Sequence, residues 1–279
     1  MAWVDLHMHT TASDGLYSPN EVVQMGYKLG LAAVAITDHD TVAGIEEAQF
    51  ASEKLPMEVI PGVEISTREQ GKEIHVLGYF IDPQDHSFTT FLSRQRNVRQ
   101  RRNEMVIEKL RSLGISITMD EVLHKQKSKT GPINVGRPHI AEVLVDKGIV
   151  HSMDEAFEKY LGEGGMAYCT PPRVTPAEAI KRIREAGGVP VLAHPGLYGD
   201  DQLVEKIIQE GLAGLEVYHP DHTQKMEQNY LQLAKKHNLI ITGGSDFHGE
   251  REGVMYHGPI GSRRVAYHQL QELKNAIPL

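Results

Sequence analysis

Short apolar runs alternate with amphipathic segments through the first 80 residues. Runs with the length of strands occur at Trp3–His9, Leu31–Thr37, Val59–Ser66 and Glu73–Phe80. The run Leu31–Thr37 is apolar enough for burial on both faces. A helix is expected after Ser18, where Ser-Pro-Asn-Glu forms a capping box, and another over Val42–Lys54. This alternation predicts a parallel α/β sheet or barrel.

The pattern changes between about residues 87 and 170, where the signals are mostly helical. One long helix is expected over Phe88–Leu113, with shorter ones near Thr118, Arg137 and Met153. Alternation then resumes, with strands expected at Val189–Ala193, Gly214–Tyr218 and Leu239–Thr242. The strand number favours an incomplete (β/α) barrel over a dinucleotide-binding fold, and no G-x-G-x-x-G follows the first strand. We predict a barrel in two parts, residues 1–86 and 171–279, with a helical insert or cap over 87–170.

Nearly every expected strand leads into a His, Asp or Glu side chain. His7 and His9 alternate along one strand and so point to the same side. Because sites form at the carboxyl ends of strands in such folds, these side chains are expected to meet in one cleft. The set comprises His7, His9, Asp14, His39, Glu64, His75, His194, Asp246 and His248. Nine ligands exceed one tetrahedral ion and suit two or three divalent ions (Mn, Fe or Zn) that share a carboxylate such as Glu64.

Composition and net charge limit the partners and the location that the protein is expected to have. The chain has 279 residues, 15 histidines and one cysteine, and its net charge is −8, which argues against a long nucleic acid as partner. No run of about 18 apolar residues is present, so no membrane association is expected. The first residues lack a basic region followed by an apolar stretch, and we expect a cytoplasmic protein. The sequence carries no signal for oligomeric state.

Five motifs together resemble those of the PHP (polymerase and histidinol phosphatase) family. They are Asp5-Leu6-His7-Met8-His9-Thr10, Thr37-Asp38-His39-Asp40, Pro61-Gly62-Val63-Glu64, His194-Pro195 and Ser245-Asp246-Phe247-His248. The resemblance implies a distorted (β/α)7 barrel with a di- or trinuclear metal site. It implies a first ion at His7, His9, Glu64 and Asp246, a second at Glu64, His75 and His194, and a third at Asp14, His39 and His248.

The helical insert resembles that of the YciV/TrpH-like phosphoesterases of the family. The segments Gly136-Arg137-Pro138-His139-Ile140-Ala141 and Lys159-Tyr160-Leu161 carry this likeness. It implies activity on nucleoside 3′,5′-bisphosphates and on short oligonucleotides.

Clustered divalent ions lower the pKa of bound water and neutralise a phosphoryl group, so we expect phosphate-ester hydrolysis by a metal-activated hydroxide. Arg137 and His139, at a helix start, are expected to contact a second phosphate. The run Arg94–Arg102 holds five arginines, of which Arg102 is expected to face the cleft.

Two histidines past the sixth strand are candidates for phosphate binding (His219) and for protonation of the leaving group (His222). Asp38 is expected to orient a ligand imidazole. Each of these residues also has a purely structural interpretation.

The predicted function is a metal-dependent phosphoesterase that removes a phosphate from a small nucleotide, such as a nucleoside 3′,5′-bisphosphate. Two other enzymes share the metal motifs: a histidinol-phosphate phosphatase and a 5′-3′ exonuclease on short oligonucleotides. A non-catalytic metal-bound module is a fourth alternative, which the intact set of nine ligands disfavours.

Overall fold

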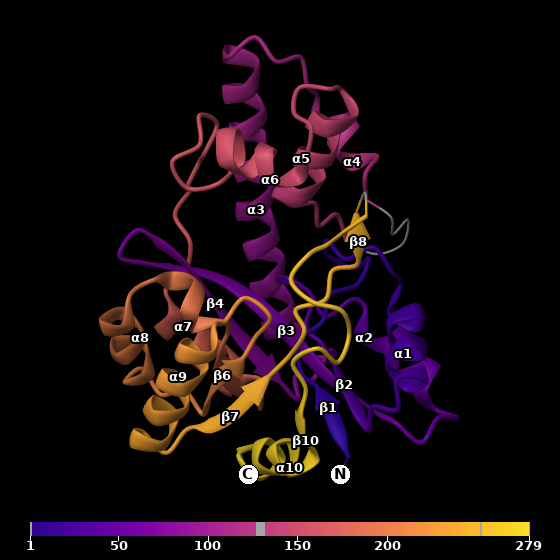
Figure 1. Ribbon diagram of the computed structural model, residues 1–279, viewed down its shortest axis with the longest axis vertical. Coiled ribbons are helices and arrows are strands. Elements are labelled where there is room, and N and C mark those ends of the chain that lie inside the picture. Colours follow the sequence, from indigo (N-terminus) through magenta and orange to yellow (C-terminus); the bar gives the residue numbers. More distant parts are fainter. Residues whose placement is uncertain (1, 127–131, 252, 279) are drawn as a thin grey trace.

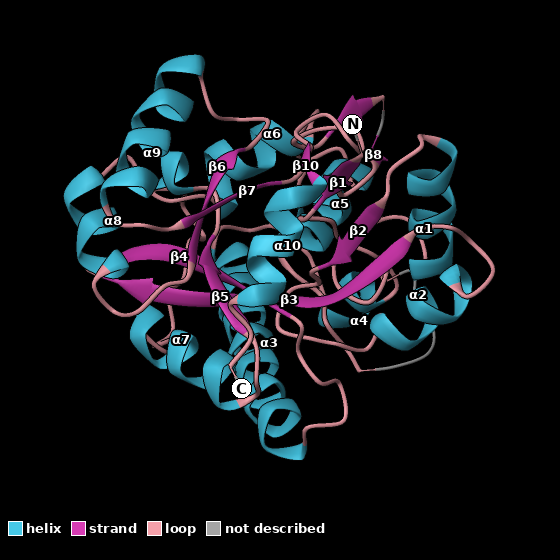
Figure 2. Ribbon diagram, turned by 90° about the horizontal axis from the view of Figure 1, so that it is seen from below, coloured by secondary structure: helices cyan, strands magenta, loops and turns pink. Residues whose placement is uncertain are grey.

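The computed structural model describes residues 2–126, 132–251 and 253–278. At its centre is a curved sheet in the order β10-β1-β2-β3-β4-β5-β6-β7 (Figures 1 and 2). The strands are β1 (Trp3–Asp5), β2 (Ala33–Ile36), β3 (Glu58–Glu69), β4 (Lys72–Tyr79), β5 (Val189–Leu192), β6 (Gly214–Tyr218), β7 (Ile240–Gly243) and β10 (Val265–Ala266). The sheet nearly closes on itself where the segment after β1 meets the segment after β7. There Leu6 N–H donates to the Gly243 carbonyl at 3.2 Å, and Met8 forms a β-bridge with Phe247. The predicted distorted barrel is therefore confirmed as a nearly closed sheet.

Strand β4 departs from the expected parallel arrangement. It pairs antiparallel with both β3 and β5, with Ser66 opposite His75 and Val76 opposite Leu192. The cause is local: β3 and β4 are joined by the two-residue turn Gln70-Gly71, with φ of 48° and 84°, which is far too short for a parallel crossover. The first half of β4 consequently lies beside the ends of β3 and β5, and His75 reaches the site from there.

Helices cover the outside of the sheet (Figure 2). They are α1 (Pro19–Lys28), α2 (Ile45–Ser52), α7 (Pro176–Glu185), α8 (Asp201–Ile208), α9 (Gln224–Lys236) and α10 (Tyr267–Asn275). Helix α1 begins with the expected capping box, in which the Ser18 hydroxyl accepts from Glu21 N–H and the Glu21 carboxylate accepts from Ser18 N–H. Within the described residues, none of the helices has the length and apolar character needed to cross a membrane.

The segment between β4 and α7 is mostly helical and rises from one end of the sheet (Figure 1). It contains α3 (His86–Ser112), α4 (Met119–Leu123), α5 (Arg137–Asp146), α6 (Met153–Ala156) and the π-helical turn η1 (Phe157–Leu161). The first half of α3 packs into the barrel core through Phe88 and Leu92. Its second half joins a separate hydrophobic cluster with Leu144 and Leu161. Helix α3 thus connects two cores and fixes the insert against the barrel.

Two further elements border the site. The 3-10 turn η2 (Pro195–Tyr198) follows β5, and the strands β8 (Glu250–Arg251) and β9 (Val254–Met255) form a short hairpin after β7. Figure 1 places β8 beside the helices of the insert. The pattern of apolar residues did not indicate this hairpin.

Candidate metal centre and substrate pocket

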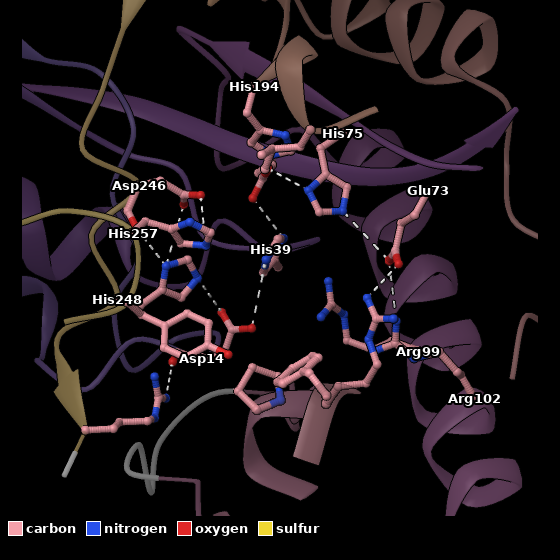
Figure 3. Close-up of a pocket in the computed structure, with 17 residues that line it drawn as sticks. Asp14, His39, Glu73, His75, Arg99, Arg102, His194, Asp246, His248 and His257 are labelled. Atoms are coloured by element: carbon pink, nitrogen blue, oxygen red, sulfur yellow. Dashed lines mark hydrogen bonds and ion pairs between the residues drawn. The ribbon is translucent and has the colours of Figure 1, made fainter. Parts of the chain in front are cut away.

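A pocket of about 270 Å³ lies where the strand ends face α3 and α5 (Figure 3). Seven of the nine predicted metal ligands line it: Asp14, His39, Glu64, His75, His194, Asp246 and His248. The other two, His7 and His9, are completely buried below them. Strands separated by some 240 residues in sequence thus deliver their polar ends to one place.

Eight of the nine side chains fall into three groups whose potential ligand atoms lie close together, and the ninth, His194, contacts Glu64. Potential ligand atoms of His7, His9, Glu64 and Asp246 all lie within 4.8 Å of one another, as do those of His9, Asp14, His39 and His248. A third group joins His39, Glu64 and His75, and His194 Nε2 lies 3.0 Å from Glu64 Oε1. Glu64 therefore sits between two groups, the position in which a shared carboxylate was expected.

The donor atoms fit divalent cations. Six buried atoms in this cluster make no hydrogen bond within the described residues: Asp14 Oδ1, His39 Nδ1, Glu64 Oε2, His75 Nε2, His194 Nδ1 and Asp246 Oδ1. His39 Nδ1 and Glu64 Oε2 are only 3.0 Å apart, yet neither is hydrogen-bonded. Burial of unpaired carboxylate oxygens is costly, whereas a cation between them and the imidazole lone pairs removes that cost.

Hydrogen bonds behind the imidazoles select the tautomer that a metal ligand needs. His7 Nδ1–H donates to Glu216, at 3.0 and 3.2 Å from its two oxygens. His248 Nδ1–H donates to the Asp246 carbonyl at 2.8 Å. In each ring Nε2 is then left with a lone pair that faces the acidic ligands. Glu216 was missed by the sequence analysis, and its only signal was a glutamate inside the apolar strand Leu215-Glu216-Val217.

Asp38 acts on His9 rather than on His39. Its carboxylate accepts from Thr10 N–H at 2.7 Å and from the Ser13 hydroxyl at 2.6 Å. Ser13 Oγ lies 3.4 Å from His9 Nδ1, so Asp38 and Ser13 hold the loop that carries this imidazole. The sequence predicted that Asp38 orients a ligand imidazole without specifying which one. In the structure Asp38 lies behind His9, which follows the neighbouring strand β1.

The electrostatics of the cluster keep its carboxylates ionised. Burial by itself raises the pKa of Glu64, Asp14 and Asp246, but the surrounding imidazoles hold all three pKa values well below the usual range. Burial lowers the pKa of His39 and of His194 to about 4, which leaves these rings neutral. Neutral imidazoles and ionised carboxylates are the forms that bind metal ions. Burial by itself lowers the pKa of His9 and His75, but neighbouring carboxylates raise it to about 10 and about 9, so a metal ion displaces a proton from these two rings.

An arginine group forms the opposite wall of the pocket (Figure 3). Arg99, Arg102 and Arg137 line it, and Arg102 and Arg137 share one carboxylate, Glu73, at 3.5 and 2.6 Å. Arg102 is 4% exposed, and its Nε makes no hydrogen bond within the described residues. Burial first, and the charge of Arg137 second, lower the pKa of Arg102. Two guanidinium groups facing one carboxylate leave a net positive charge in the wall.

Three predicted substrate or acid residues do not line the pocket, although one of them, His219, contacts a predicted metal ligand. His222 is hydrogen-bonded to backbone on both sides, since Nδ1–H donates to the Val217 carbonyl (2.8 Å) and Nε2 accepts from Gly196 N–H (3.0 Å). His139 accepts from Gly136 N–H at 3.0 Å and caps α5 from within the core. His219 is fully buried and donates through Nε2 to Asp246 at 3.2 Å. These three rings are outside the pocket lining, where the additional imidazole is His257.

Comparison with known proteins agrees with this geometry. The model of the PHP domain matches residues 5–160. The chain is 36% identical over 249 residues to a 5′-3′ exoribonuclease of Haemophilus influenzae, which covers 88% of this chain and 89% of that protein. It is 33% identical over 258 residues to a 3′,5′-nucleoside bisphosphate phosphatase of Chromobacterium violaceum, which covers 91% and 90%.

A solved structure gives the same result for the fold. A protein of Bifidobacterium adolescentis described as a metal-dependent phosphoesterase superimposes with a TM-score of 0.88 and 32% identity, over 99% of this chain and 96% of that one. The nearly closed barrel, the cluster of buried ligands and these relatives agree with one another. This chain belongs to the PHP family and is a phosphoesterase.

Proposed function

We propose that this protein removes one phosphate from a nucleoside 3′,5′-bisphosphate. The observation that carries the proposal is the placement of two phosphate-attracting groups in one pocket of about 270 Å³. The ligand cluster forms one side and the arginine group, Arg99, Arg102 and Arg137, forms the other. A small substrate with two phosphates matches both sides at once. The name of the Chromobacterium relative supports the same substrate class.

The ligands divide among two or three divalent ions. His7, His9, Glu64 and Asp246 would hold the first ion, Glu64, His75 and His194 the second, and Asp14, His39 and His248 the third. Mn, Fe and Zn all suit imidazole and carboxylate donors. Bound there, the ions lower the pKa of water towards about 7 and neutralise phosphoryl charge. The protein contributes ligand orientation, through Glu216 and through Asp38 with Ser13.

The arginine group would hold the phosphate that is not cleaved. Arg137 is the first residue of α5, where the backbone N–H groups favour anions. Arg102 and Arg137 share the single carboxylate of Glu73, so one positive charge is left without a counterion within this group. A phosphate bound there would accept from the guanidinium groups and balance that charge. A single-phosphate substrate such as histidinol phosphate leaves this wall unused, which favours the bisphosphate.

A second candidate activity is 5′-3′ cleavage of short oligonucleotides. The 36% identity to an exoribonuclease favours it, and the same pocket accepts a terminal nucleotide. The net charge of −8 disfavours long chains, because each added phosphate increases repulsion. If a 20-mer binds tightly with a steep salt dependence, the small-substrate proposal is wrong.

The test is phosphate release from adenosine 3′,5′-bisphosphate with Mn²⁺, compared with adenosine 3′-monophosphate. We expect turnover of the bisphosphate with the higher kcat/KM. Arg137→Gln should raise KM for the bisphosphate about tenfold, the effect of losing a charge-assisted contact, and should change KM for the monophosphate much less. Arg184→Gln, on the outer helix α7, is the matched control. Absence of turnover with every divalent ion tested would refute the proposal.

A further inference from the structure

One part of the pocket is apolar, in contrast to its charged remainder. Pro138, Phe157, Leu197 and Tyr256 line it from α5, η1, η2 and the segment after β9. Leu197 is 47% exposed. Four separate segments therefore contribute apolar surface to the lining of this pocket. Neither the metal ligands nor the arginine group accounts for this surface.

Two of these apolar lining residues are neighbouring aromatic rings. The centroids of Phe157 and Tyr256 are 6.4 Å apart with planes inclined at 49°, so the rings do not stack on each other. Both also pack against the hydrophobic cluster of the insert, which supports them from behind. Burial raises the pKa of Tyr256 to about 12, so its phenol is neutral in the working range.

The hairpin that carries Tyr256 is tied to the metal cluster. Arg251, in β8, donates to the Asp14 carbonyl at 2.6 Å and pairs with Glu142 of α5. Tyr256 also packs edge-on against His257, with centroids 5.6 Å apart. On the other side, the Arg137 guanidinium lies 3.5 Å from the carbonyl of Leu161, the last residue of the turn that carries Phe157. The two rings are thus fixed relative to both phosphate-attracting groups.

We propose that Phe157 and Tyr256 bind the base of the nucleotide substrate. A flat, neutral ring system is the group that an aromatic surface beside two phosphate sites recognises, and stacking on such a surface tolerates every base. This inference rests on the proposed function and adds to it: the substrate must carry a base, with little preference among purines and pyrimidines. Without a base, a sugar bisphosphate meets the charged part of the pocket and leaves the rings uncovered.

The rings also have a bracing role, because they connect the hairpin to the insert. Variants must therefore separate loss of an aromatic face from loss of support. Tyr256→Leu and Phe157→Leu keep apolar bulk behind the pocket and remove the π surface. Tyr256→Phe keeps the ring. Phe50→Leu is the matched control, since Phe50 lies on α2 and is 73% exposed to solvent.

The experiment compares adenosine 3′,5′-bisphosphate with 1,4-anhydroribitol 3,5-bisphosphate, which keeps the sugar and both phosphates but lacks the base. The measured quantity is the ratio of kcat/KM for the two substrates with Mn²⁺. We expect Tyr256→Leu and Phe157→Leu each to lower this ratio about tenfold through KM, the size expected for loss of base stacking. Tyr256→Phe and Phe50→Leu should keep the wild-type ratio. The corresponding monophosphate products, titrated by calorimetry, should show the same loss of affinity only with the base present.

The possible outcomes are distinct. If the leucine variants lose kcat/KM equally for both substrates, the rings serve as a brace and the inference is wrong. If wild type hydrolyses both substrates with the same kcat/KM, the base is not recognised and the inference also fails, while the proposed function stands. If wild type hydrolyses neither, the proposed function fails and this inference fails with it.

Discussion

The carboxylate behind the metal cluster offers the sharpest single perturbation, Glu216→Gln. Glu216 is fully buried, and its carboxylate accepts from His7 Nδ1–H and, at 2.8 Å, from His194 N–H. One side chain therefore orients ligands of two predicted ion positions. Burial alone would raise the pKa of Glu216, but His7, His219 and His194 lower it, so the group is ionised at neutral pH.

Glutamine keeps the shape and one acceptor oxygen. That oxygen still accepts from His194 N–H, while the amide NH₂ faces His7 Nδ1–H, so that two hydrogen-bond donors point at each other. The imidazole is then driven towards the tautomer with its proton on Nε2, the atom that faces Glu64 and Asp246 at 3.5 and 3.3 Å. A hydrogen bond to a charged group contributes about 1.5–3 kcal/mol, which corresponds to a loss of about 10- to 100-fold in metal affinity or activity, the usual range for such partners.

The assay is Mn²⁺ titration by calorimetry, together with kcat/KM at saturating Mn²⁺. Glu216→Gln should weaken the tightest Mn²⁺ binding by about 10- to 100-fold. The control is Glu205→Gln, an exposed glutamate of α8 that pairs with Lys236, and it should match wild type. If Glu216→Gln binds Mn²⁺ and turns over substrate as wild type does, the reasoning about tautomer control is wrong.

His222→Ala should lower the free energy of unfolding in urea by about 2 kcal/mol, since Val217 O and Gly196 N lose their partner. The pH–rate profile of the variant should keep the wild-type shape. Loss of the alkaline limb of that profile would instead identify His222 as the general acid. Burial lowers the pKa of His139 below 6.5. As the pH falls, the unfolded chain therefore takes up this proton first, and the free energy of unfolding decreases from pH 6.5 down to the folded-state pKa. His139→Gln should flatten the slope of unfolding free energy between about pH 7 and 5 by up to 1.4 kcal/mol per pH unit, and an unchanged slope would contradict the buried neutral ring. Chelation of metal should lower Tm, because ions bound only to the folded state at 100 times Kd each add about 2.7 kcal/mol; equal melting curves with and without chelator would argue against tight binding.

That the predicted ligand side chains meet in one cluster could be inferred from the sequence because strand ends mark them. An apolar run that stops at His, Asp or Glu places that side chain at the end of a strand. His75 joins the cluster for another reason, since it lies in the first half of β4 and reaches the site because that strand is antiparallel. The turn Gln70-Gly71 was the sequence signal for this reversal.

Residues that act through tertiary contacts were harder to assign. Glu216 is flanked by apolar residues that also fit a half-buried strand, and only the fold brings it against His7 from 209 residues away. Asp38 was expected to orient a ligand imidazole, but only the fold shows that it supports the loop that carries His9. His222 and His139 resembled active-site histidines in the sequence, but backbone groups already occupy both ring nitrogens of His222 and Nδ1 of His139.

Short elements also escaped prediction. Strands β8, β9 and β10 have two residues each, too few for any alternation to be recognised. The helical face of α3 was only partly predicted: Arg102 does face the pocket, and Arg99, three residues before it, was not singled out. Which face of a long helix meets a barrel depends on packing at both of its ends, here on two different hydrophobic clusters.

The central claim is that side chains from distant strands hold divalent cations jointly, with Glu64 shared between two of them. The most direct measurement is the number of Mn²⁺ ions bound per chain after equilibrium dialysis, for wild type, Glu64→Ala and the control Glu69→Ala on the same strand. The account predicts two or three ions for wild type and Glu69→Ala, and at most one for Glu64→Ala. An equal number of ions in all three proteins would contradict it.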